Sequence, residues 1–101
     1  MRVPAVLLPH RVTIRPYLGH GAAGPILGDP IRRRAFVEDA RRLVRDAEGH
    51  EVVSETTVYL APGVEVAPES EVITPTRTAR VITSATLDHP RAPSHLVLSL
   101  T

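Results

Sequence analysis

Short segments rich in Thr, Val and Ile recur along the whole chain, and proline or glycine closes most of them. Residues branched at Cβ favour extended strands, whereas proline and glycine end strands and form turns. The pattern is therefore typical of several short strands joined by turns. We expect a mainly β protein, with about six or seven short strands arranged as a small antiparallel barrel or sandwich in a single domain, 1–101.

The composition limits how this domain can be stabilised. The chain has 101 residues, which is enough for one hydrophobic core, and 43% of them are hydrophobic. Phe36, Tyr17 and Tyr59 are its only aromatic residues apart from histidine, so we expect an aliphatic core. The absence of cysteine excludes disulfide bonds and thiolate metal sites.

The charge of the chain is nearly balanced. Twelve basic and 11 acidic residues give a net charge of +1, which argues against a dedicated, strongly basic nucleic-acid binder. All 12 basic residues are arginine, and Asn and Gln are absent as well. This usage indicates codon bias in a GC-rich genome, while selection for bidentate arginine contacts is the alternative. The apolar run 3–8 is too short for a membrane helix, so we expect a protein that does not associate with membranes.

The expected elements follow from the alternation of apolar and polar residues. The strands are expected at 10–17, 31–37, 51–60, 71–74, 78–87 and 95–100. Segment 18–30 contains four glycines and two prolines and is expected to be a flexible loop, either functional or ordered by a partner. Segment 88–93 (DHPRAP) is expected to be a rigid loop.

Segment 38–50 matches two patterns. The first is an amphipathic helix, because apolar residues occur at helical spacing at Phe36, Val37, Ala40, Leu43, Val44 and Ala47. The second is a long hairpin, in which Gly49 supplies the left-handed residue of a four-residue turn. The Thr- and Val-rich segment that follows favours the hairpin, but local pattern leaves both open.

No catalytic or cofactor-binding constellation is visible. Residues 19–24 (GHGAAG) match a dinucleotide-binding fingerprint, but Pro25 follows and prevents the helix that this fingerprint must open. The five histidines lack the spacing of a metal site, and the serines lack a neighbouring base. We therefore expect no enzymatic activity, no cofactor and no bound metal.

Arginine is concentrated in two places, Arg32–Arg33–Arg34 and Arg41–Arg42 with Arg45. Acidic residues alternate with the second group, so one interpretation is a solvated face with ion pairs. The other is a subunit interface or a surface near a phosphate backbone. The scarcity of aromatic residues argues against stacking on single-stranded nucleic acid.

The order of several segments resembles the small head-completion proteins of tailed bacteriophages, the head-closure or head-to-tail stopper family. The resemblance covers nearly the whole chain. It rests on the segments PHRVTIR (9–15), the glycine-rich segment after it, FVE (36–38), RLVRDAEG (42–49), EVVS (51–54), TVY (57–59), EVI (71–73), TARVI (78–82) and HLVL (95–98). Members of this family often carry glycine in the turn before the long sixth strand, where this chain has TPTR (74–77).

The resemblance implies a homo-oligomeric ring of small β-barrels in the neck of the virion, commonly of about twelve copies. Such a ring lies beneath the portal and adaptor rings, closes the DNA channel after packaging, and provides the surface on which the tail terminator or tail tube docks. Double-stranded DNA passes through it without sequence-specific binding. The alternatives are another neck or tail-completion subunit, or a host β-barrel binding module of the OB type.

In members of the family, a loop that closes the channel corresponds by position to 39–53 here. The candidate channel-closing residues are Asp39, Arg41, Arg42, Leu43, Val44, Arg45, Asp46, Glu48, Gly49, His50 and Glu51. Since local preferences within this segment compete, we expect it to change conformation between the free subunit and the ring.

A second set of residues is expected at interfaces between subunits. These residues are Arg32, Arg33, Arg34, Val6, Leu7, Leu8, Gly19, Gly21 and Gly24. The apolar run 6–8 has two interpretations: it packs on a neighbouring subunit, or it packs on its own barrel.

Overall fold

The computed structural model describes residues 8–89 and 92–101, and the side chains of 8–86 and 95–101. This part of the chain forms ten β-strands and no helix. It therefore contains no helical segment that could cross a membrane. The strands are β1 (His10–Arg15), β2 (Tyr17–Gly21), β3 (Gly24–Leu27), β4 (Ile31–Glu38), β5 (Arg42–Arg45), β6 (Glu51–Ser54), β7 (Thr56–Leu60), β8 (Glu71–Ile73), β9 (Thr78–His89) and β10 (Ala92–Leu100).

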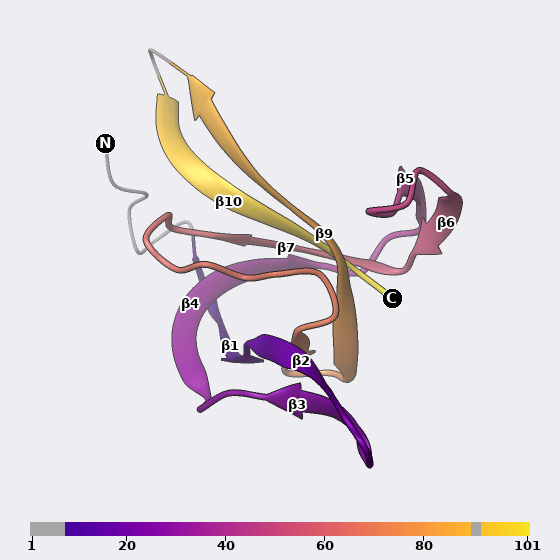
Figure 1. Ribbon diagram of the computed structural model, residues 1–101. Helices are drawn as coiled ribbons and strands as arrows, with labels where there is room; N and C mark the ends of the chain where they lie inside the picture. The colour runs from indigo at the N-terminus through magenta and orange to yellow at the C-terminus, as the bar shows by residue number, and fades with distance from the viewer. Residues whose placement is uncertain (1–7, 90–91) are drawn as a thin grey trace.

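Six of these strands close into an antiparallel barrel in the order β1-β4-β7-β10-β9-β8 (Figure 1). The expected small antiparallel barrel is therefore confirmed. The remaining four strands form two separate hairpins, β2–β3 and β5–β6, which explains why the chain has more strands than expected.

The core of the barrel is aliphatic. In β10, Leu96, Leu98 and Leu100 are buried and alternate with the outward-facing Val97, as the period of two predicts. The neighbouring strands contribute their alternate residues in the same way. The core cluster consists of Val12, Ile14, Ala35, Val58, Leu60, Val66, Val72, Ala79, Val81, Leu96, Leu98 and Leu100.

The expectation of a flexible loop at 18–30 is wrong. Most of this segment forms the β2–β3 hairpin, in which His20 pairs with Pro25 and Gly21 with Gly24. Gly24 has a φ of 118°, which a residue with a side chain rarely adopts, and it begins the strand directly after the turn. Glycine here permits a tight hairpin rather than a disordered loop. Pro25 is tolerated because it lies in an edge strand.

Two other boundaries differ from expectation. The single strand expected at 51–60 is divided at Glu55, because β6 pairs with β5 whereas β7 pairs with β4 and β10. The loop expected at 88–93 is largely strand, since β9 extends to His89 and β10 begins at Ala92. β7 pairs with β10 only from Leu96 onwards, so the proline at 93 interrupts no ladder with β7.

Candidate functional site

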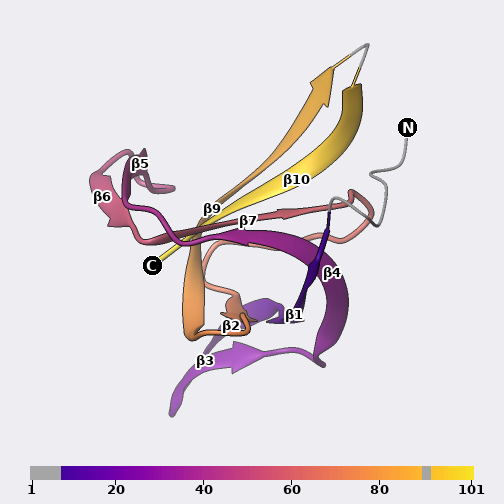
Figure 2. The same cartoon turned by 180° about the vertical axis from the view of Figure 1, so that it is seen from behind.

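The β5–β6 hairpin occupies most of the segment in which helix and hairpin patterns compete, and the hairpin interpretation is confirmed. Leu43 pairs with Val53, and Val44 pairs with Val52. Gly49 has a φ of 86°, the left-handed conformation expected for its place in the turn. Figure 2 shows that the hairpin projects from one side of the barrel.

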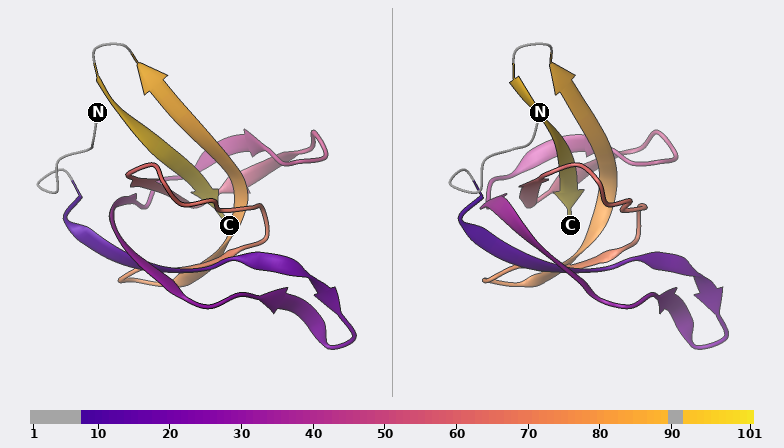
Figure 3. Two further views of the ribbon diagram at one scale, coloured as in Figure 1. Left: turned by 60° about the vertical axis from the view of Figure 1, so that its left-hand side comes forward. Right: turned by 90° about the vertical axis from the view of Figure 1, so that its left-hand side faces the viewer.

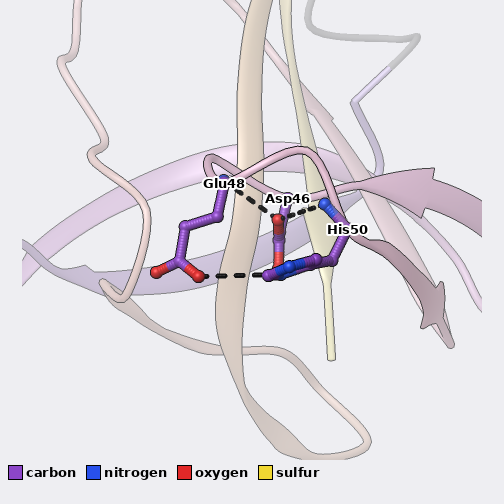
Figure 4. Close-up of side chains that lie close together, drawn as sticks. All are labelled: Asp46, Glu48 and His50. Atoms are coloured by element: carbon purple, nitrogen blue, oxygen red, sulfur yellow. Dashed lines mark hydrogen bonds and ion pairs between the residues drawn. The ribbon is translucent and has the colours of Figure 1, made fainter.

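Asp46 organises the turn of this hairpin (Figure 4). Its Oδ1 accepts hydrogen bonds from the backbone N–H groups of Glu48, at 3.0 Å, and His50, at 2.9 Å. Its own backbone N–H donates to the carbonyl of His50, and its carbonyl accepts from the N–H of Gly49. A short aspartate side chain thus satisfies the backbone groups that a four-residue turn leaves unpaired.

His50 lies between two carboxylates in the same turn. Its Nδ1 is 3.7 Å from Oδ2 of Asp46 and 3.6 Å from Oε2 of Glu48. The ligand atoms of the three residues lie within 4.8 Å of one another, a spacing that a cation could use. Oδ1 of Asp46 is already occupied by two N–H groups, however, and the side chain of Glu48 is 80% exposed. The arrangement is therefore that of a hydrogen-bonded turn and not of a preformed metal site.

The turn predicts a specific pH dependence. The hydrogen bond from the backbone N–H of His50, helped by that of Glu48, lowers the pKa of Asp46 below its ordinary value of 3.8, although partial burial opposes the shift. Because the pKa of Asp46 is lower in the folded than in the unfolded state, its ionised carboxylate stabilises the fold. This stabilisation is present above pH 3.8 and is lost as the pH falls through the lower pKa of the folded state. In an NMR titration, we expect the Asp46 carboxyl to titrate below pH 3.8 and the His50 amide shift to follow it.

The variant Asp46→Asn is the control for this titration, because it keeps an acceptor oxygen without a titrating charge. Its His50 amide is expected to show no such transition. A midpoint for Asp46 at or above 3.8 would contradict the role of this carboxylate in the turn.

Ion pairs hold the base of the hairpin. Nε of Arg41 is 3.0 Å from Oε1 of Glu55, and the guanidinium of Arg42 pairs with Glu38. Asp39 accepts a hydrogen bond of 2.8 Å from the hydroxyl of Thr56 in the barrel. For Arg41 and Arg42, the interpretation as a face with ion pairs is therefore confirmed.

A cleft of about 540 Å³ separates part of the hairpin from the barrel. Val52 and Ala47 line it from the hairpin, and Val81 and Ile82 line it from β9. Leu43 is 70% exposed, and its partner Val53, which also lines the edge of the cleft, is 46% exposed. The hairpin is thus fastened mainly at its base, and the apolar pair Leu43 and Val53 is largely exposed.

The arginines on β4 differ from those at the base of the hairpin. Arg32, Arg33 and Arg34 are exposed, and together with Arg11 of β1 they line a shallow pocket. Within the described part of the chain none of the four forms an ion pair, although Arg34 donates to the carbonyl of Leu8 and Arg33 to that of Arg32. We call these four residues the arginine patch. Arg11 was missed in the sequence because only the β1–β4 register, which pairs it with Arg34, brings it there.

The other expected interface residues do not gather at one place. Gly19, Gly21 and Gly24 belong to the β2–β3 hairpin, which is separate from the β5–β6 hairpin (Figure 1). Leu8 is only 5% exposed, in accordance with packing on its own barrel. Val6 and Leu7 lie outside the described residues.

The sequence also gave no indication of a row of rings on the outside of the barrel. Phe36 on β4 contacts Tyr59 on β7 edge to face, with ring centroids 5.9 Å apart, and Tyr59 contacts His95 on β10 at 6.1 Å. His10 contacts Phe36 from the other side. The pairing of β4 with β7 and of β7 with β10 thus brings these few rings together. This pairing cannot be recognised from the local sequence.

No protein-family model, curated protein or solved structure matches this chain. A small antiparallel barrel supports many unrelated functions, so the fold leaves the function open. The two hairpins, the arginine patch and the row of rings are the features from which a function can be inferred.

Proposed function

We propose that this chain is a structural protein of the bacteriophage neck, the ring-forming head-to-tail stopper. One observation carries the proposal: a closed barrel presents the projecting hairpin β5–β6 at 42–54, almost the segment 39–53 that the resemblance assigns to channel closure. A rigid barrel can form the ring wall while the hairpin forms the movable closure.

The construction of the hairpin is suited to this role. Its attachment at Asp39, Arg41 and Glu55, with a cleft beneath it, allows it to turn as a unit about its base. The exposed pair Leu43 and Val53 gives each hairpin an apolar face that can pack against those of other copies. Acidic groups in its turn repel the phosphates of DNA, so that DNA passes without being gripped.

The partners follow from this proposal. The ring binds copies of itself, the adaptor and portal rings above, and the tail terminator or tail tube below. Double-stranded DNA passes through its channel. The role is structural, with no catalytic step and no cofactor, and it is carried out in the neck of the virion.

A second candidate function has one specific observation in its favour. The row formed by Phe36, Tyr59 and His95 continues from the arginine patch along β4, and Phe36 is 40% exposed. Aromatic rings beside arginines are the elements with which OB-type modules bind single-stranded nucleic acid. The rings contact one another edge to face, however, which leaves less of each ring free to stack on a base.

Assembly on the phage portal–adaptor complex tests the proposal. We expect the purified chain to add a ring beneath the adaptor, in register with the portal, when the particle is imaged by electron microscopy and weighed by native mass spectrometry. Hydrogen exchange is expected to differ between free chain and ring at 43–49. A chain that stays monomeric with this complex, and binds an oligothymidine instead, would overturn the proposal and favour the second candidate.

A further inference from the structure

The turn of the β5–β6 hairpin and the arginine patch carry opposite charges. The turn brings together Asp46, Glu48 and Glu51, and Arg45 is the one arginine within 45–51. Arg80 of β9 lines the cleft beneath the turn. We call residues 45–51 the hairpin tip. Arg45 donates to the carbonyl of Gly49, whereas the side chains of Glu48 and Glu51 are exposed. The tip is therefore an exposed acidic projection.

The arginine patch is a cationic surface that forms no ion pair with the described residues. Its four arginines come from two adjacent strands and, together with Val12 and Thr13, line a shallow pocket. Exposed like charges on paired strands repel one another, so an anionic partner would stabilise them. Guanidinium groups bind carboxylates through paired N–H groups, which makes this patch suitable for Asp and Glu side chains.

The two surfaces lie on opposite sides of the barrel. In Figures 1 and 2 the β5–β6 hairpin extends from one side, and the curved first half of β4 runs along the other. In the right-hand view of Figure 3 the hairpin is faded behind the barrel, whereas β1 and β4 are in front. A single chain therefore cannot bring its own tip to its own patch.

Complementary surfaces on opposite sides of one subunit are the requirement for head-to-tail assembly. We propose that the hairpin tip of one copy binds the arginine patch of the next copy. The inference rests on the proposed ring and identifies its interface. Because the tip and the patch are different surfaces, each copy uses both, and the contacts continue around the ring until it closes.

The proposed contact would also control the position of the hairpin relative to the channel. A docked tip spans the boundary between two copies and is held away from the channel axis. Release from the patch frees the hairpin to turn about its base toward the axis, where the apolar pairs Leu43 and Val53 can meet. Docking thus corresponds to the open channel and release to the closed one.

Charge reversal at both surfaces tests the contact. In the variant Glu48→Arg/Glu51→Arg the formal charge of the tip, counted over its Arg, Asp and Glu residues, changes from −2 to +2. In the variant Arg11→Glu/Arg32→Glu/Arg34→Glu the formal charge of the patch changes from +4 to −2. Each variant alone is expected to need at least about tenfold more protein to add a ring to the portal–adaptor complex, because like charges then face each other. An equimolar mixture of the two variants is expected to restore the ring, since each basic tip then meets an acidic patch.

The control is Glu65→Arg on the loop between β7 and β8, which changes the net charge as much as the single tip variant Glu48→Arg does. It is expected to assemble like the unaltered chain. If the unaltered chain forms a ring and neither reversal weakens it, the proposed contact is wrong and the proposed function is unaffected. If the unaltered chain forms no ring, the proposed function itself fails.

Cross-linking tests the same contact directly, because the chain contains no cysteine of its own. The variant Glu48→Cys/Arg32→Cys is expected to give a ladder of disulfide-linked multimers when the assembled ring is oxidised. The matched variant Glu65→Cys/Arg32→Cys is expected to remain monomeric on a non-reducing gel. Equal ladders from both variants, or none from the first, would overturn the proposed contact.

Discussion

Replacing Leu98 by alanine is expected to lower the free energy of unfolding by about 2–5 kcal/mol. Leu98 is completely buried in β10, where it pairs with Val58 of β7 and Ser84 of β9. Its side chain therefore packs where three barrel strands meet, and its truncation removes apolar contacts and leaves a cavity. For a domain of this size, such a loss is a large fraction of the total stability.

Urea unfolding followed by circular dichroism measures this loss. The matched control is Leu43→Ala, the same substitution in the β5–β6 hairpin, where the side chain is 70% exposed. We expect that variant to differ from the unaltered chain by no more than about 0.5 kcal/mol. Similar losses from the two variants would contradict the barrel core described above.

Replacing Thr57 by valine is expected to raise the free energy of unfolding by about 1 kcal/mol. Thr57 is only 1% exposed, and its Oγ1 is buried with no hydrogen-bond partner in the described structure. A buried hydroxyl without a partner loses its hydrogen bonds to water on folding, and valine has nearly the same shape without this cost. The substitution thus removes an unfavourable polar group from β7.

The preceding residue of the same strand provides the control. Thr56 is also completely buried, but its hydroxyl donates to Asp39 at 2.8 Å and accepts from Arg77 at 3.0 Å. Thr56→Val removes both hydrogen bonds and is expected to lower stability by about 1 kcal/mol. Thermal or urea unfolding of the two variants should therefore shift in opposite directions, and a loss in both would contradict the unsatisfied state of Thr57.

Much of the fold could be predicted because it depends on local chemistry. Alternation of apolar residues at 95–100 predicted the buried face of β10, and the Thr- and Val-rich segment after Gly49 favoured the β5–β6 hairpin over a helix. The glycine-rich segment was misinterpreted as a loop because the same glycines that permit flexibility also permit a tight hairpin. Only the pairing of β2 with β3 distinguishes a tight hairpin from a flexible loop.

The candidate site was predicted less completely. Arg32, Arg33 and Arg34 stand together in the sequence, so their concentration was visible from the start. Arg11 joins them only because β1 pairs with β4, and Phe36 meets Tyr59 only because β4 pairs with β7. The surroundings of these residues depend on register between strands that are far apart in the chain.

Short-range chemistry therefore establishes the β class of this protein, the alternation of its strands and the turn at Asp46 and Gly49. Backbone preferences and side-chain hydrogen bonds act within a few residues, so each of these features can be recognised in its own segment. Tertiary structure alone decides that six strands close into a barrel, that Arg41 and Arg42 are paired while the arginine patch is not, and that patch and hairpin tip lie on opposite sides. These outcomes depend on long-range strand pairing, in which each strand selects one partner and one register to bury the common core.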